Sequence, residues 1–76
     1  MDTLLEILSE IKPGVDFESE TALVDDGILD SLDIISIISE ISDEYDVTVS
    51  PEEIVPENFN SAEAIYSLIQ ELADED

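Results

Sequence analysis

The hydrophobic positions of the chain form stripes with helical spacing, separated by polar segments. The first stripe covers Asp2 to Ile11, where apolar residues recur three and four positions apart around Glu6 and Glu10. Pro13-Gly14 follows and ends the helix, because proline has no backbone N–H for the next helical hydrogen bond. The sequence therefore predicts a first helix over residues 2–11.

A long segment without sustained periodicity follows this helix. Residues 15–29 include the turn-forming run Asp25-Asp26-Gly27, and we predict a loop. A loop of this length in a small domain is usually functional or well packed. We expect apolar side chains of the loop to hold it to the core: Phe17, Leu23, Ile28 and Leu29.

The longest stripe predicts a second helix from Asp30 or Ser31 to about Tyr45. Asp30 is a preferred N-cap residue, and Asp33 places negative charge in the first turn, where the helix dipole favours it. The apolar residues of this segment make a wide stripe suited to the centre of a bundle: Leu32, Ile34, Ile35, Ile37, Ile38, Ile41 and Tyr45.

Two shorter elements complete the predicted fold. After an extended link at residues 47–49, Ser50-Pro51-Glu52-Glu53 predicts a helix start with a Ser50–Glu53 capping box, and we expect Pro56 to end this helix quickly. A last helix is predicted from Asn60 or Ser61, with Asn60 as a cap paired with Glu63, and residues 74–76 as a fraying tail. Its apolar face comprises Ala62, Ile65, Leu68, Ile69 and Leu72.

These elements together predict an all-α fold. We expect a small four-helix bundle with a long loop between the first and second helices and a short third helix, in a single domain of residues 1–76. The apolar fraction of 43% supports a folded core, although a net charge of -21 is otherwise typical of disorder.

The charge narrows the classes of partner. The chain has 22 acidic residues and one basic residue, Lys12, so it lacks the cations that nucleic acids and anionic membranes require. Proteins with basic patches are the expected partners. The N-terminus lacks a basic region followed by an apolar run, so we expect no signal peptide, no membrane insertion and a cytoplasmic location. We also expect a monomer.

The composition argues against an enzyme. The chain contains no His, Cys, Trp or Arg, so most general bases, thiol nucleophiles and oxyanion-stabilising cations are missing. Carboxylates alone support glycosidase-type chemistry, but they require a sizeable cleft between them. We predict a non-catalytic protein with no metal site.

The segment from Gly27 to Asp33 is the one place suited to carry chemistry. An Asp30-Ser31-Leu32 triplet that follows a long loop and opens a hydrophobic helix in a small acidic protein resembles the attachment site of the acyl carrier protein family. The similarity extends over nearly the whole chain in the order of helices and loop. Residues 45–49 also resemble the family's aromatic-then-alternating stretch after the second helix.

The resemblance implies a covalent prosthetic group on Ser31. A phosphopantetheinyl transferase would use coenzyme A to esterify the Ser31 hydroxyl with 4'-phosphopantetheine. The arm would hold an acyl or aminoacyl cargo as a thioester and present it to partner enzymes, in fatty acid or related acyl biosynthesis. A phosphodiester at this position lies near free backbone N–H groups and the positive end of the helix dipole.

The resemblance also implies contacts with loading and transfer enzymes that have basic patches. The residues implied in partner binding are Asp30, Leu32, Asp33, Glu40, Asp43 and Glu44. The simpler interpretation is a solvated acidic face and, for Leu32, an ordinary core position; both interpretations stay open here.

The chain departs from fatty-acid carriers on the second helix and before Ser31. Serines stand at Ser36, Ser39 and Ser42, where those carriers often have Glu or a bulky apolar residue, and Leu29 precedes Asp30 in place of the frequent alanine. The run Gly-Ile-Leu-Asp-Ser is closer to D-alanyl carriers and other stand-alone carriers. The cargo therefore stays open.

The alternative is an acidic calcium-binding or interaction protein without a prosthetic group. Placing Gly27 at the sixth position of an EF-hand loop puts Ala22 first and Asp33 last. The first ligand is then missing, and the final bidentate glutamate is replaced by an aspartate.

Overall fold

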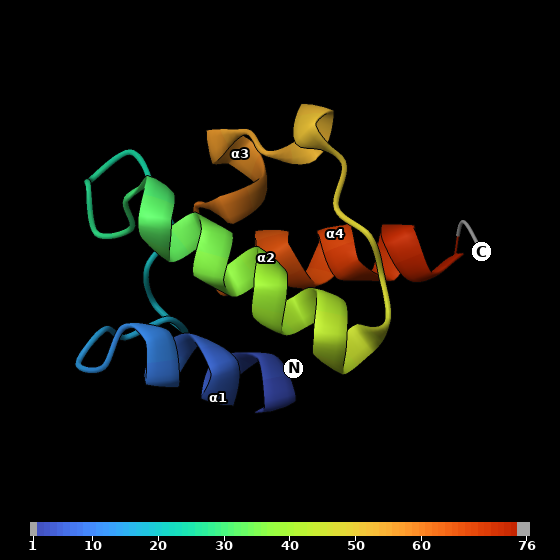
Figure 1. The fold of residues 1–76 in the computed structure, drawn as a ribbon. Helices are drawn as coiled ribbons and strands as arrows, with labels where there is room; N and C mark the ends of the chain where they lie inside the picture. The colour runs from blue at the N-terminus through green and yellow to red at the C-terminus, as the bar shows by residue number, and fades with distance from the viewer. Residues whose placement is uncertain (1, 75–76) are drawn as a thin grey trace.

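The computed structural model describes residues 2–74 and confirms the all-α fold (Figure 1). Its helices are α1 (Asp2–Ile11), α2 (Ser31–Tyr45), α3 (Pro56–Phe59) and α4 (Ala62–Asp74), and a 3-10 turn, η1 (Pro51–Glu53), precedes α3. α2 ends at Tyr45 because Asp46 adopts a left-handed conformation with φ of 54°. The Cα trace measures 33 × 24 × 19 Å.

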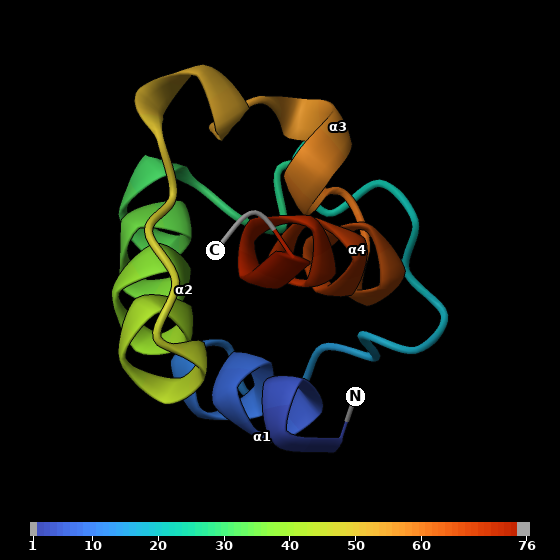
Figure 2. The same cartoon turned by 90° about the vertical axis from the view of Figure 1, so that its right-hand side faces the viewer.

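The long helices pack around a shared centre. α1 packs against α2 and α4, α2 also contacts α4, and the short α3 lies on α4. Figures 1 and 2 show α1 and α3 on opposite sides of α4. The segment from residue 46 to 55 crosses from the end of α2 to α3, so α3 stands next to the N-terminal half of α2 and leaves a groove there, described below.

Every helix and the long loop contribute to one hydrophobic core. Phe17, Leu23 and Leu29 are buried and Ile28 packs against the core, so the prediction that they hold the loop is confirmed. Burial of a side chain of this size stabilises the fold by about 1.5–3 kcal/mol. The fully buried large side chains are Leu4, Leu8, Leu23, Ile37, Ile41, Phe59 and Ile65.

The apolar stripe of α2 is wider than the face that packs. Ile37 and Ile41 are fully buried, whereas Leu32 is 73% exposed and Ile35 is 61% exposed. The prediction that Ile35 belongs to the bundle centre is therefore wrong, and of the two interpretations left open for Leu32 the core position does not hold. Ile34, Ile38 and Tyr45 are partly buried and pack against the core, so Leu32 and Ile35 are the residues of the stripe that stay in solvent.

The predicted third helix differs from the structure in two respects. The Ser50 side chain makes no capping bond; Glu53 N–H donates instead to the Ser50 backbone carbonyl at 2.9 Å. Pro56 does not end this element but begins α3 at its first position. Proline suits that position because its missing N–H has no helical acceptor there and its φ is already helical.

The cap of α4 is Ser61 and not Asn60. Ser61 Oγ accepts the Ala64 N–H at 3.0 Å, which is the N-cap bond, so the predicted Asn60–Glu63 cap is wrong. The predicted apolar face of α4 is confirmed, because all five of its residues are buried. Asp74 is the last residue of α4, and the prediction for the tail beyond it lies outside the described residues.

Candidate functional site

Ser31 is the first residue of α2, and its start is fixed by a reciprocal pair of hydrogen bonds. Asp30 is the N-cap with extended backbone; its Oδ1 accepts the Asp33 N–H at 2.9 Å, and Asp33 Oδ2 accepts the Asp30 N–H at 3.2 Å. The predicted Asp30 cap is confirmed. Ser31 itself is exposed at the N-terminal end of the helix.

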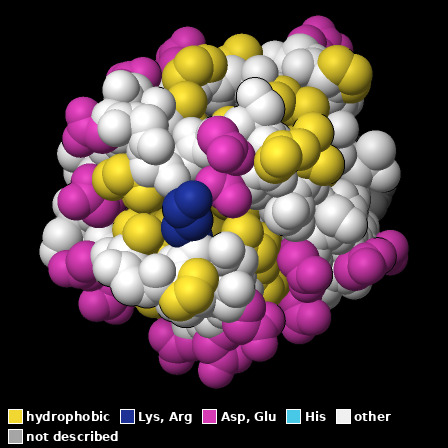
Figure 3. Space-filling view, turned by 60° about the vertical axis from the view of Figure 1, so that its left-hand side comes forward, with side chains coloured by type: hydrophobic (Ala, Val, Ile, Leu, Met, Phe, Trp, Pro, Cys, Tyr) yellow, Lys and Arg dark blue, Asp and Glu magenta, His cyan; other side chains and the backbone are white. Residues whose placement is uncertain are grey.

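The single basic residue of the chain is joined to this cap. Lys12 Nζ donates to Asp33 Oδ2 at 3.0 Å, an ion pair that links the residue after α1 to the first turn of α2. Figure 3 shows the dark blue side chain beside magenta carboxylates. The hydrogen bond from Lys12 is the main cause that lowers the pKa of the Asp33 carboxyl, with a further contribution from the Asp30 N–H. The same pair raises the pKa of Lys12.

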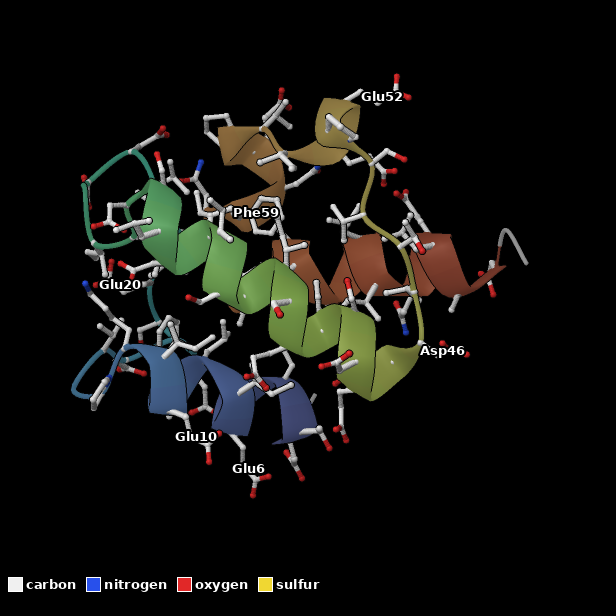
Figure 4. All side chains as sticks on the ribbon, in the orientation of Figure 1. Glu6, Glu10, Glu20, Asp46, Glu52 and Phe59 are labelled. Atoms are coloured by element: carbon white, nitrogen blue, oxygen red, sulfur yellow. The ribbon has the colours of Figure 1, made fainter. Side chains whose placement is uncertain are left out.

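An apolar groove of about 350 Å³ begins at Ser31. It lies between the first half of α2 and the segment from η1 to α3. Phe59 forms part of its lining and is fully buried, and Figure 4 shows the Phe59 ring pointing inward from α3. The residues that line the groove are Val24, Ser31, Ile34, Ile35, Ile54, Val55, Pro56 and Phe59.

Two of the three large exposed hydrophobic side chains of residues 2–74 line this groove, and the third follows Ser31 in α2. Ile35 and Ile54 are 61% and 43% exposed and line it, and Leu32, next to Ser31, is 73% exposed. Exposed apolar clusters on small proteins mark interaction sites. The structure thus decides the position of Leu32, which lies in solvent beside Ser31 and not in the core.

The predicted acidic partner residues differ in their surroundings. Asp30, Glu40, Asp43 and Glu44 are exposed, whereas Asp33 is half-buried and paired with Lys12. Figure 4 shows other carboxylates, those of Glu6, Glu10 and Glu52, pointing away from the helices. Whether the α2 acids bind partners stays a prediction.

The loop does not gather ligands for a cation. Asp25 is hydrogen-bonded to Asn60, and Asp33 is paired with Lys12. Within residues 2–74, no group of three or more acidic side chains is placed to hold a metal ion. The calcium-binding alternative therefore has no geometric support in this part of the chain.

Two features of the site were missed by sequence reasoning. Asn60 bonds to the loop rather than capping α4, and its identity as a common cap residue pointed to the wrong role. Ile54 carries no periodic signal, because it lies between a 3-10 turn and a one-turn helix. The spacing of residues in the sequence therefore indicated neither the bonds of Asn60 to the loop nor the exposed position of Ile54.

Comparison with known proteins identifies the family. The family described as the phosphopantetheine attachment site matches residues 2–72. The chain belongs to this family. It is a phosphopantetheine carrier protein with an acyl or aminoacyl carrier role, and its prosthetic group is 4'-phosphopantetheine, as the sequence predicted. No solved structure matches it significantly.

Similar carriers come from two bacterial genera. The chain is 30% identical over 76 residues to the D-alanyl carrier protein of Lactococcus lactis subsp. cremoris, covering 97% of this chain and 96% of the relative. It is 38% identical over 53 residues to the D-alanyl carrier protein of Lactococcus lactis subsp. lactis, covering 70% and 67%. Aminoacyl carrier protein 1 of Bradyrhizobium diazoefficiens is 33% identical over 63 residues, covering 83% and 69%.

The surface at the start of α2 fits a phosphopantetheine group. An exposed serine hydroxyl at a helix N-terminus is accessible to a transferase, and the open groove beside it offers apolar surface to an arm. The chain contains no cysteine, so a thiol has to come with the group. No helix within residues 2–74 has the length and apolar character needed to cross a membrane.

Proposed function

We propose that this carrier holds its phosphopantetheine arm on Ser31. The observation that supports Ser31 is its position: an exposed first-turn residue of α2, at the mouth of the groove and inside the family match. Ser36 and Ser39 are also exposed, but they lie inside α2, where each backbone N–H is bonded within the helix. A phosphodiester on them would meet no free donors.

The first turn of α2 is suited to a phosphate. The first N–H groups of a helix have no helical acceptor, and the dipole places partial positive charge there. The Asp30 side chain uses the Asp33 N–H, and the Ser31 and Leu32 amides precede it in the same turn. Lys12 offsets the charge of Asp33 nearby. The arm, once attached, supplies the thiol that forms the thioester with the cargo.

An aminoacyl group is the proposed cargo, in preference to a fatty acyl chain. The relatives described above are named as D-alanyl and aminoacyl carriers. An aminoacyl thioester carries a positive ammonium group, which the net charge of -21 attracts. Incubating the modified protein with a D-alanine-activating enzyme and with a fatty-acyl-activating enzyme tests this, because only the first is expected to load it.

The surface around Ser31 is the proposed docking site for partner enzymes. Its apolar centre is formed by Leu32, Ile35 and Ile54. The acids around it extend along α2 and are matched to basic patches on a phosphopantetheinyl transferase and on loading and transfer enzymes: Asp30, Asp33, Glu40, Asp43 and Glu44. We propose that the carrier performs no catalysis itself and works in the cytoplasm as a monomer.

Replacing Ser31 tests the assignment. After incubation with coenzyme A and a broad-specificity transferase, the wild-type protein should gain the mass of one phosphopantetheine group, and Ser31→Ala should gain none. Ser36→Ala is the matched control and should be modified like the wild type. Helicity should be retained in Ser31→Ala, because Asp30 still caps α2. Modification of Ser31→Ala would disprove the assignment.

A further inference from the structure

Asn60, between α3 and α4, is bonded to the loop that leads to Ser31. Its Oδ1 accepts the backbone N–H groups of Val24 (3.0 Å) and Asp25 (3.1 Å), and its Nδ2 donates to Asp25 Oδ2 (3.3 Å). Its backbone carbonyl accepts the Leu23 N–H at 2.8 Å. One residue thus bonds the N–H groups of Leu23, Val24 and Asp25, which lie more than 30 positions earlier in the chain.

The fixed part of the loop continues directly to the cap of α2. The Leu29 N–H donates to the Leu23 carbonyl at 2.9 Å, and the Gly27 N–H donates to the Val24 carbonyl at 3.0 Å. Gly27 permits this tight turn because its φ of +76° is one that other residues rarely adopt. Leu29 is buried and directly precedes the Asp30 cap. Hydrogen bonds therefore connect Asn60 to residues 23–29, and this segment leads directly to the Asp30 cap and to Ser31.

The same junction forms both sides of the groove. Phe59 is buried and lines it from α3, and the next residue, Asn60, holds Val24, which lines it from the loop. α3 cannot shift away from α2 without carrying the loop along or breaking the Asn60 bonds. The groove wall and the approach to Ser31 are therefore mechanically linked.

We infer that Asn60 is a positioning residue for the attachment and delivery chemistry at Ser31. By bonding the loop to the α3–α4 junction, it presents the loop, the Asp30 cap and the serine to partner enzymes in one geometry. This inference rests on the proposed role of Ser31. A loop that is already ordered before a partner docks does not have to be ordered during docking, so the carrier binds its partners more tightly.

Kinetics of phosphopantetheine transfer test the inference with a matched control. Asn60→Ala removes the side-chain bonds to the loop, so the loop must be ordered on docking. The KM for the carrier should rise about tenfold with kcat within about twofold, the pattern of lost binding. Asn58→Ala is the control: Asn58 is also half-buried, but its Nδ2 donates at 2.8 Å to the Glu53 carbonyl, away from the loop. It should leave both constants unchanged.

An exchange of side chains separates positioning from simple loss of stability. Asn60→Asp places a carboxylate against Asp25 and should raise KM, whereas the double variant Asn60→Asp, Asp25→Asn restores a donor facing an acceptor and keeps the net charge. Its KM should return to within about twofold of the wild type. Hydrogen exchange at the Val24 and Asp25 amides should rise in Asn60→Ala and return in the double variant.

Two results would overturn the role of Asn60: a KM for Asn60→Ala equal to that of Asn58→Ala, or a double variant as defective as Asn60→Asp. The double variant tests the role of Asn60 even where the single variants do not fold. A folded double variant with the KM of the wild type supports the bond between residues 60 and 25, and a folded double variant with a raised KM refutes it. Failure of the Ser31 proposal is distinguishable, since the wild-type protein would then remain unmodified at Ser31 regardless of residue 60.

Discussion

Replacing Asp30 distinguishes its role as a cap from its role as a charge that partners recognise. Asp30→Ala deletes the acceptor of the Asp33 N–H bond of 2.9 Å, whereas Asp30→Asn keeps an oxygen acceptor and removes only the charge. Loss of an N-cap costs about 1 kcal/mol, within a range of about 0.5–2 kcal/mol. In a domain of this size, a loss of about 1 kcal/mol lowers the Tm by roughly 4–8 °C.

Both variants remove one of the charges behind the net -21, so relief of repulsion is common to both and their difference isolates the hydrogen bond. Circular dichroism melts should show Asp30→Ala several degrees below Asp30→Asn, with Asp30→Asn near the wild type. In transfer assays, a defect shared by both variants identifies Asp30 as a partner contact. Equal melting temperatures for the alanine variant and the wild type would refute the capping argument, and equal destabilisation of both variants would attribute the effect to charge.

Further predictions concern acid, partners and salt. Because Lys12 holds the pKa of Asp33 below its ordinary 3.8, their pair stabilises the fold fully above that value and is lost as pH falls through the lower, folded pKa. Lys12→Met lacks this pair, so its free energy of unfolding should fall less on acidification than that of the wild type. Circular dichroism against pH measures this difference, and an acid transition equal to that of the wild type would contradict it. Loading should slow as ionic strength rises, since the Debye length is already about 8 Å at physiological salt. Asp43→Lys should slow loading further, whereas Asp74→Lys should have little effect, and rates indifferent to both would exclude electrostatic steering. Sodium chloride should raise the Tm, and magnesium chloride of matched ionic strength should raise it more by diffuse binding to the acidic surface; a flat Tm in all conditions would show that charge repulsion does not limit the fold.

The Lys12–Asp33 ion pair makes Asp33 unsuitable for the charge-reversal test of electrostatic steering. Asp33 was an expected partner residue, but its carboxylate is shared between Lys12 and the Asp30 N–H. A lysine at position 33 would break the capping box and place two cations together, so its effect would mix folding with docking. Asp43 is exposed and Asp74 lies at the far end of α4, so this pair reports on charge alone.

The elements that follow from local rules were predictable. α1, α2 and α4 have apolar residues at helical spacing, and each of these helices has the bounds or the packed face expected from its own residues. The Asp30 cap is equally local, since the donor and acceptor are three residues apart. Ser31 was therefore placed correctly at the start of α2 from the sequence alone.

Short elements were less predictable, because the same residue suits two roles. Proline both ends one helix and begins the next, and at Pro56 the second role applies. Asparagine caps helices, but its side chain also bonds backbone amides of loops. The Asn60 side chain has the second role, because it accepts the N–H groups of Val24 and Asp25. A turn of three or four residues has too few positions for periodicity to choose between them.

Tertiary packing alone decided what surrounds Ser31. The sequence identifies Leu32 and Ile35 as apolar, but only the packing of the helices leaves both in solvent. The groove and the Lys12–Asp33 pair join residues far apart in the chain, and nothing in local spacing encodes such contacts. The sequence determined the long helices, the charge and the position of Ser31 at the start of α2. The exposed apolar surface beside Ser31 depends on the packing, because the neighbouring helices leave Leu32 and Ile35 of the α2 stripe uncovered.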